Sequence, residues 1–300
     1  MRARRQTTIT NVICHPCQVV EIQFRKPSMT YKPGQWLFLN CPDVSYYQWH
    51  PFTITSCPSD PYVSVHVRQV GDFTKDLADA LGAGPHQAKL YDDPTYAYEI
   101  AVRQGEKLPK LRIDGPYGAP AEDVFDNEIS VLIGTGIGVT PWSSILKHIW
   151  HWRSLNSARA GRLRRIEFIW VCRDTSSFEW FQKLLAALEL QDTNDEFLRI
   201  NVYLTQRVQD DTAANIQLNS AGAEFDAITN LRSRTHFGRP NFYTILSQMH
   251  DNIFDGTYIP GMDSAIRNTV SVYFCGPNVA AREIKAACCQ ATSSEVRFRF

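Results

Sequence analysis

Hydrophobic and polar positions follow different patterns in the two parts of the chain. In residues 7–68, short runs alternate apolar and polar side chains with a period of two, which is typical of half-buried antiparallel strands. From residue 129 onward, continuous apolar runs alternate with stretches of helical periodicity, which is typical of parallel strands covered by helices. The pattern therefore predicts an antiparallel β-barrel over residues 1–120 and a parallel-sheet α/β domain over residues 121–300.

A glycine-rich turn separates the first predicted parallel strand from the helix that follows it. Glycines recur at Gly134, Gly136 and Gly138, where the apolar run ends. Thr140 is the expected N-cap and Pro141 the expected first residue of the helix. Bare backbone amides and the positive end of a helix attract an anion, most often a phosphate. The G-x-G-x-G spacing lacks the third glycine of the usual dinucleotide motif, so a turn that serves only tight packing is the alternative.

Small or polar residues also follow other predicted strands of the second domain. Parallel strands end at one edge of their sheet, and ligands bind at these carboxyl ends. Several such ends are a stronger signal than one glycine turn, and together they predict one shared site. Ser176 and Glu179 have the spacing of a capping box at the start of a further helix. The strand ends are residues 134–140, Cys172-Arg173-Asp174, Thr205 and Cys275-Gly276-Pro277.

The predicted barrel carries its own candidate chemistry. Strand alternation places Ser64, His66 and Arg68 on one face of a strand, with valines on the other face. That polar face ends beside Gly71 and a helix expected to start near Thr74. An arginine, a glycine turn and a helix N-terminus together predict a pyrophosphate clamp. A half-exposed strand histidine and a solvated arginine are the alternative.

Composition narrows the function classes. The chain has 31 basic and 31 acidic residues, so no nucleic-acid footprint is expected. No apolar run approaches the roughly 18 residues of a transmembrane helix, and no signal peptide opens the chain, which predicts a soluble protein as given. The eight cysteines are scattered, which fits reduced thiols in the cytosol. Cys14 and Cys17 have redox-motif spacing but no following helix and no second ligand pair, so a structural role and no metal site are expected.

Taken in order, the motifs resemble the ferredoxin–NADP reductase superfamily. In detail they look like the dehydrogenase half of an NADPH oxidase catalytic subunit of fungal type. The resemblance covers nearly the whole chain. The motifs that carry it are His50-Pro51-Phe52-Thr53, residues 66–74, residues 114–118, residues 134–141, Cys172-Arg173-Asp174, Phe178-Glu179-Trp180, residues 235–240 and Cys275-Gly276-Pro277.

This resemblance implies FAD and NADPH as cofactors, with Arg173 and Arg239 gripping the 2′-phosphate of NADPH. No side chain is assigned as a catalytic acid or base. Thr53, at the flavin, and Cys275, at the nicotinamide, are the candidates for adjusting the reactivity of the cofactors. The residues expected to hold FAD are His50, Pro51, Phe52, Thr53, His66, Arg68 and Thr74. The residues expected to hold NADPH are Gly134, Thr135, Gly136, Ile137, Gly138, Thr140, Pro141, Arg173, Thr205, Arg239, Cys275, Gly276 and Pro277.

The implied reaction is hydride transfer from NADPH to FAD. In a full-length parent at the cytosolic face of a membrane, electrons would pass through a haem domain to oxygen and make superoxide. The haem part is expected before Arg2 and a terminal aromatic residue after Phe300, and cytosolic regulatory proteins are expected among the partners. Two alternatives stay open. One is the dehydrogenase domain of a ferric-chelate reductase, and the other is a nucleotide-binding regulatory module that docks partners through residues 84–109 and 206–237.

Overall fold

The chain forms two compact units in the computed structural model, which describes residues 7–27, 29–84, 98–100, 108–155, 162–173, 175–192, 196–205, 224–259 and 268–300. The first unit extends to Glu122 and also contains the segments Thr140–His151 and Glu179–Phe181. The second unit contains Asp123–Val139, Trp152–Phe178 and the chain from Gln182 onward. These two later segments come after residue 121, so the two units are not separated at one point of the chain. The predicted boundary between residues 120 and 121 stays a prediction.

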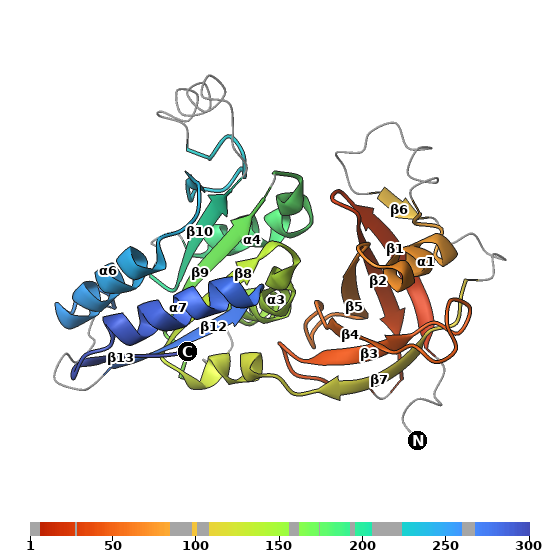
Figure 1. Ribbon diagram of the computed structural model, residues 1–300, viewed down its shortest axis with the longest axis horizontal. Coiled ribbons are helices and arrows are strands. Elements are labelled where there is room, and N and C mark those ends of the chain that lie inside the picture. Colours follow the sequence, from red (N-terminus) through yellow and green to blue (C-terminus); the bar gives the residue numbers. More distant parts are fainter. Residues whose placement is uncertain are drawn as a thin grey trace. The chain divides into compact units, whose positions relative to one another are not determined.

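Antiparallel strands build the first unit, as the period-two pattern predicts. One sheet has the strand order β5-β2-β1-β6 and the other has the order β4-β3-β7 (Figure 1). Alternate side chains of both sheets meet in one core that includes Ile22, Phe24 and Leu37. The elements are β1 (Thr8–His15), β2 (Val19–Arg25), β3 (Trp36–Asn40), β4 (His50–Thr53), β5 (Val63–Arg68), α1 (Asp72–Ala80), β6 (Tyr98–Ile100) and β7 (Arg112–Tyr117).

The second unit contains a parallel sheet of six strands, in the order β11-β10-β9-β8-β12-β13. Its central strand β8 is buried along nearly its whole length, which explains the continuous apolar run in its sequence. Helices α6 and α7 lie side by side and pack against strands β8, β12 and β13 (Figure 1). The strands are β8 (Ile129–Thr135), β9 (Arg165–Cys172), β10 (Leu198–Leu204), β11 (Thr235–Phe237), β12 (Asn268–Cys275) and β13 (Val296–Arg299). The helices are α3 (Thr140–Ser154), α4 (Glu179–Gln191), α6 (Phe242–Phe254) and α7 (Asn278–Ala291), with short 3₁₀ turns at Pro120–Asp126, Gly136–Val139 and Thr175–Phe178.

Strand order in this sheet reverses between β8 and β12. The chain runs outward from β8 through β9 and β10 to β11, and it then returns to place β12 on the other side of β8. The connections that leave the carboxyl ends of β8 and β12 therefore diverge to opposite sides. In open parallel sheets this switch point is where ligands bind.

Two helix starts differ from the sequence-based expectation. Helix α3 begins at Thr140 itself, because a 3₁₀ turn runs directly into it. The prediction of a capping box at Ser176 is wrong, because α4 begins at Glu179 and its N-cap residue is Phe178. Phe178 has helical dihedral angles, and its buried ring packs edge-on against Trp170 at 5.1 Å. The 3₁₀ turn thus continues into the helix without the extended residue that a serine cap requires.

The two segments named above as docking surfaces, residues 84–109 and 206–237, each contain an edge strand. Tyr98–Ile100 pairs with β1, while the neighbouring residues 85–97 and 101–107 lie outside the described part of the chain. Thr235–Phe237 pairs with β10, and residues 206–223 lie outside the described part. Both strands have only three residues, too few for a periodic pattern to predict them.

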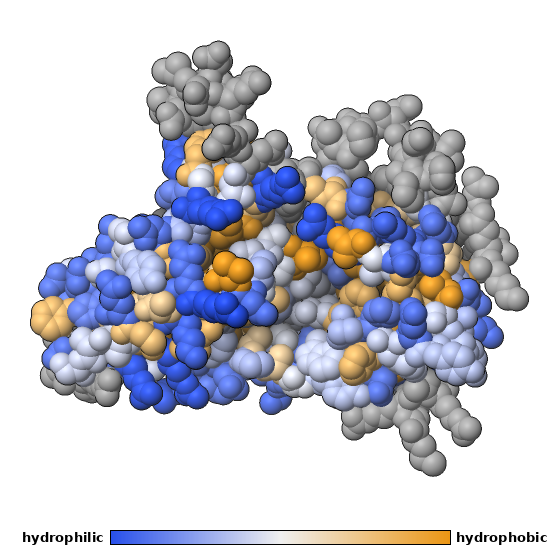
Figure 2. All heavy atoms as spheres, in the orientation of Figure 1, coloured by the Kyte–Doolittle hydropathy of each residue, from blue (hydrophilic) through white to orange (hydrophobic). Residues whose placement is uncertain are grey.

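On the face drawn in Figure 2, hydrophilic residues predominate and hydrophobic ones form small groups, as is usual for a protein surface. Within the ranges that the structure describes, none of the helices has the length and apolar character needed to cross a bilayer.

Candidate functional site

Two turns meet at the switch point of the parallel sheet. Gly134 at the end of β8 is the register partner of Cys275 at the end of β12. A Cβ atom on Gly138 would lie 2.3 Å from the carbonyl oxygen of Cys275, and one on Gly276 would lie 2.0 Å from Thr135 Oγ1. Gly138 therefore packs directly against the backbone of the other turn, whereas Gly276 packs against the Thr135 and Phe274 side chains, and neither glycine leaves room for a Cβ atom without a shift.

The middle of the glycine turn faces open space. Gly136 has a φ of +53°, and a Cβ atom there would meet nothing within 4 Å. Its carbonyl oxygen accepts a hydrogen bond from Trp170 Nε1 at 3.2 Å, which anchors the turn to β9. The Thr135 hydroxyl is buried and has no hydrogen-bond partner among the described residues. A bare turn beside an unsatisfied hydroxyl fits a ligand that brings hydrogen-bonding oxygens, such as a nucleotide.

Three further strand ends lie next to one another along the same edge. Leu204 at the end of β10 is the register partner of both Cys172 and Phe237. Thr205 donates hydrogen bonds to the Cys172 carbonyl from its backbone N–H (2.8 Å) and its hydroxyl (3.0 Å), so its side chain ties β10 to β9.

Arginines follow two of these ends. Arg173 comes directly after β9, and Arg239 comes two residues after β11; both side chains are exposed. Their strands are separated only by β10, so the strand ends lie about 10 Å apart. The adjacent Asp174 lies outside the described residues. The two guanidinium groups can converge on one anionic ligand at this edge.

Cys275 does not supply a charged nucleophile to the switch point. Its thiol is partly buried, and burial raises its pKa above the ordinary value. The thiol is therefore neutral near pH 7. Gly276 and Pro277 continue from it, with Pro277 as the extended N-cap residue of α7.

In the first unit, the predicted pyrophosphate clamp lies where β5 passes into α1. Arg68 is exposed at the end of β5. The helix begins at Asp72, two residues before Thr74, with Gly71 as its N-cap. The Thr74 hydroxyl accepts hydrogen bonds from the backbone N–H groups of Val70 (3.1 Å) and Gly71 (3.0 Å) and is also 2.9 Å from the Gly71 carbonyl. Thr74 thus closes the first turn of its own helix.

Strand β4 contains the histidine, proline, phenylalanine and threonine of the predicted flavin motif. His50 stacks on Phe73 of α1, with ring centroids 3.9 Å apart, and so joins β4 to the predicted clamp. Thr53 is the register partner of Trp36 in β3, which packs against Tyr117 of β7 at 4.9 Å. Pro51 is exposed, and Phe52 and Thr53 are half-buried. The strand therefore presents partly exposed aromatic and hydroxyl groups that suit a planar ring system.

His66 is buried, although strand alternation predicts it on a ligand-facing polar face. Its Nδ1 lies 2.8 Å from Thr55 Oγ1, its Nε2 lies 3.7 Å from Glu21 Oε2, and its ring packs on Trp180 at 4.2 Å. Burial lowers the pKa of His66 from 6.5 to about 4, although Glu21 opposes this shift. Burial by itself raises the pKa of Glu21, but His66 and hydrogen bonds from His15 and Gln23 outweigh it and lower that pKa to about 2.

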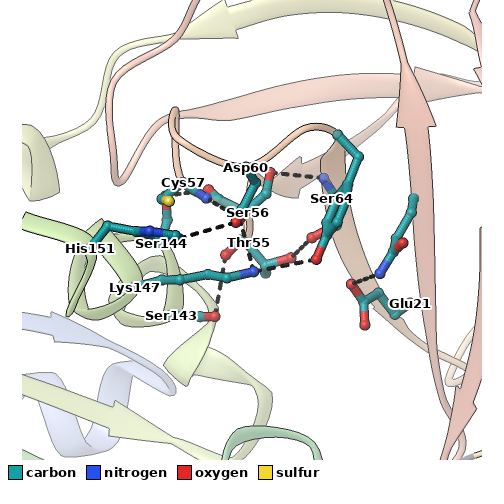
Figure 3. Close-up of polar contacts among 12 residues, drawn as sticks. Glu21, Thr55, Ser56, Cys57, Asp60, Ser64, Ser143, Ser144, Lys147 and His151 are labelled. Atoms are coloured by element: carbon teal, nitrogen blue, oxygen red, sulfur yellow. Dashed lines mark hydrogen bonds and ion pairs between the residues drawn. The ribbon is translucent and has the colours of Figure 1, made fainter. Parts of the chain in front are cut away.

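The start of α3 is attached to the segment after β4 by side-chain contacts that sequence reasoning missed (Figure 3). Ser143 and Ser144 donate hydrogen bonds to the carbonyls of Thr55 (3.3 Å) and Ser56 (2.6 Å). Lys147 Nζ lies 2.8 Å from Asp60 Oδ2. Burial by itself lowers the pKa of Lys147, but Asp60 outweighs it and raises that pKa. Thr140 and Pro141 thus lie in a segment of the first unit, whereas the glycine turn before them belongs to the second.

Comparison with protein families gives two adjoining matches. Residues 4–121 match a family described as FAD-binding domain, and residues 128–289 match a family described as ferric reductase NAD binding domain. The chain is 36% identical over 298 residues to a superoxide-generating NADPH oxidase heavy chain of Dictyostelium discoideum, covering 96% of this chain and 39% of that protein. It is 36% identical over 302 residues to NADPH oxidase 1 of Rattus norvegicus, covering 99% of this chain and 47% of that protein. The chain thus spans about half the length of such relatives, or less.

Solved structures show the same fold at low sequence identity. The CS-b5R domains of human Ncb5or align with a TM-score of 0.58 at 14% identity, covering 99% of this chain and 69% of that chain. A ferredoxin NADP⁺ reductase from Neisseria gonorrhoeae, with bound FAD and NADP, aligns with a TM-score of 0.52 at 14% identity, covering 98% of both chains. These likenesses confirm the predicted fold class of an antiparallel β domain followed by a parallel α/β domain.

Replacing Gly138 by alanine tests the contact between the two turns. The new Cβ atom would lie 2.3 Å from the Cys275 carbonyl oxygen, so the turns must separate. We expect the free energy of unfolding, measured by urea denaturation, to fall by about 1–3 kcal/mol. Gly71→Ala is the control, because its Cβ atom meets nothing within 4 Å, and it should cost no more than about 1 kcal/mol. Equal losses in the two variants would contradict a tight contact.

The buried His66 predicts a pH dependence of stability. In the unfolded chain its pKa returns toward 6.5, so between pH 6.5 and about 4 the unfolded state binds a proton that the folded state excludes. Stability is therefore full above this window and falls as the pH is lowered through it, by on the order of 1–3 kcal/mol. Urea denaturation across the window should show a smaller fall for His66→Gln, while the control His250→Gln keeps the wild-type fall. An unchanged fall in His66→Gln would refute the assignment.

Proposed function

Because this chain belongs to the family of the ferric reductase NAD binding domain, we propose that it is a dehydrogenase module that oxidises NADPH with FAD as the hydride acceptor. The observation that carries the proposal is the backbone contact between the turns after β8 and β12, at the switch point where a nucleotide binds in such sheets. Relatives that are NADPH oxidases support the choice of NADPH.

On this proposal, residues of the second unit bind and orient NADPH. The bare turn at Gly136 and the unsatisfied Thr135 hydroxyl would face its oxygens, with Cys275 on the other side of the switch point. Arg173 and Arg239 would bind the 2′-phosphate, which carries two negative charges that NADH lacks. Ile137, Gly138, Thr140, Pro141, Thr205, Gly276 and Pro277 would complete the site by shaping the turns and strand ends.

Residues of the first unit would hold FAD, which supplies the hydride acceptor when bound. His50, Pro51, Phe52 and Thr53 would line the ring system, and Arg68 would pair with the pyrophosphate. Thr74 would contribute indirectly, because its hydroxyl holds the first turn of α1, next to Arg68, in place. Because His66 is buried, it would stabilise β5 through its packing and would not contact the phosphate of FAD. The 1–120 and 121–300 division remains our expectation for the two cofactor-binding parts.

No side chain needs to act as an acid or base in this reaction. The neutral thiol of Cys275 agrees with that, since it offers neither a proton acceptor nor a thiolate near pH 7. Its contribution, like that of Thr53, would be to tune the environment of the cofactor it faces. Orientation and exclusion of water then supply the rate enhancement.

In a full-length parent, we infer that electrons continue through a membrane haem domain of the same chain to oxygen. A relative described as superoxide-generating supports this, although this chain spans only 39% of that protein. The module would then lie at the cytosolic face of the membrane, with NADPH, the haem domain and cytosolic regulatory proteins as partners. A fungal-type parent stays a prediction.

A ferric-chelate reductase is the second candidate, favoured by the description of the matched family as ferric reductase. The two differ in the final acceptor. Assay of the full-length parent in membranes would separate them, because an oxidase gives dye reduction that superoxide dismutase suppresses and a ferric reductase gives ferrous iron directly. The residues expected to dock partners in a regulatory module lie largely outside the described part of the chain.

Rapid mixing tests the dehydrogenase proposal. A visible spectrum first establishes that the purified chain retains FAD, and the flavin-loaded protein is then mixed with NADPH in a stopped-flow instrument. We expect the flavin absorbance to bleach in an exponential phase, because hydride transfer reduces the ring. Mixing with NADP⁺, which has no hydride to give, is the control and should cause no bleaching. A flavin that stays oxidised at saturating NADPH would sink the proposal and favour a regulatory module.

Replacing Arg173 and Arg239 by alanine tests the nucleotide preference. Each lost charge-assisted contact should weaken NADPH binding by about 1.5–3 kcal/mol and leave NADH nearly unaffected. The measurement is the concentration dependence of flavin bleaching with each nucleotide. Arg282→Ala, which removes another arginine of the same unit, is the matched control. An equal loss for NADPH and NADH would contradict the 2′-phosphate assignment.

A further inference from the structure

A cluster of metal-ligand side chains lies on the four-stranded sheet of the first unit, on the face of β5 that ends at Arg68. It consists of His15 at the end of β1, Glu21 in β2 and His66 in β5. Glu21 and His66 are direct register partners, and His15 lies diagonally across β1 and β2. Sequence neighbours such as Val20 and Val65 point into the core on the other face of the same sheet. The three strands therefore bring two imidazoles and one carboxylate to one point.

Both distances that involve the Glu21 carboxylate are close to those of a tetrahedral site. Glu21 Oε2 lies 3.3 Å from His15 Nε2 and 3.7 Å from His66 Nε2, and the three ligand atoms all lie within 4.8 Å of one another. Donor atoms bound tetrahedrally to Zn²⁺ at about 2.0–2.2 Å are about 3.3–3.6 Å apart. The side chains of His15, Glu21 and His66 are 8%, 12% and 5% exposed, so the three ligand groups are largely shielded from water.

Neighbouring groups orient two of the three ligands. Thr55 Oγ1 lies 2.8 Å from His66 Nδ1, which leaves Nε2 directed toward Glu21. Gln23 Nε2 donates to Glu21 Oε1 at 2.9 Å, which leaves Oε2 for the shared point. Such outer partners fix ring orientation and ligand choice in known metal sites.

We propose that His15, Glu21 and His66 bind a divalent transition-metal ion of the Zn²⁺ class through two imidazole nitrogens and one carboxylate oxygen. The ion ties β1, β2 and β5 together and keeps a fourth position for water. This site differs from the Cys14 and Cys17 pair, for which the sequence predicts a structural role.

A second group of metal-ligand side chains does not compete with this assignment. Cys57, Asp60 and His151 also lie within 4.8 Å of one another. The Asp60 carboxylate, however, already holds the Lys147 ammonium group at 2.8 Å. A cation thus occupies the place that a metal ion would take, and the like charge of Lys147 opposes a second one.

Cobalt titration of the 300-residue chain tests the proposal, with Zn²⁺ as the competitor. We expect one Co²⁺ per chain, with visible bands of a nitrogen–oxygen site and no near-ultraviolet thiolate band, and we expect Zn²⁺ to displace it. His15→Phe keeps a ring that can stack on His66 but removes the ligand atom, and it should weaken binding by at least roughly 10- to 100-fold. Zn²⁺ should raise the melting temperature of the wild type and not that of His15→Phe.

His151→Phe is the matched control and should bind Co²⁺ as the wild type does. Circular dichroism establishes that each variant is folded, and Glu21→Gln replaces His15→Phe if that variant is not. The proposal is overturned if the wild type binds no Co²⁺, if folded His15→Phe or Glu21→Gln binds as tightly as the wild type, or if a thiolate band appears and His151→Phe abolishes it.

Discussion

The close approach of two backbone turns at the switch point is the constraint on which the proposed nucleotide site depends. Gly134 and Cys275 are register partners, and beyond them a Cβ atom on Gly138 would meet the Cys275 backbone, while one on Gly276 would meet the Thr135 and Phe274 side chains. Gly136, between Gly134 and Gly138 in the chain, faces open space, since a Cβ atom there would meet nothing within 4 Å. The same sheet order places the ends of β9, β10 and β11 in a row beside the glycine turn. One topological reversal thus brings together residues separated by more than a hundred positions in the chain.

Polar contacts attach the first part of α3, Thr140–His151, to the first unit. Ser143, Ser144 and Lys147 are bound to the segment from Thr55 to Asp60 (Figure 3). The apolar stripe of α3 explains why it is a helix, but it does not distinguish one packing partner from another. Hydrogen bonds and a largely buried ion pair depend on geometry, and these contacts are made with the segment from Thr55 to Asp60.

Buried polar groups in the first unit follow the same principle. His66 and Glu21 lie opposite each other on a sheet whose other face is apolar core, and burial alone disfavours the charge of either. Their contacts with Thr55, Gln23 and His15 compensate for the lost water. The hydrogen bonds from Thr55 and Gln23 also orient His66 and Glu21 before any ion binds, as outer partners do for the ligands of known metal sites.

The sequence by itself determined the two kinds of sheet, the glycine turn, the strand ends that would face a nucleotide, and the family resemblance. These features depend on local periodicity, on residue types with special backbone freedom and on motif order, all of which can be read along the chain. Only the tertiary structure decided that His66 turns toward Glu21, that the start of α3 joins the first unit, and that Phe178 displaces Ser176 as the helix cap. Each of these outcomes depends on a partner far away in the chain or on competition between packing and a local hydrogen bond. Period-two alternation assigns His66 to a face, but it carries no information about what covers that face.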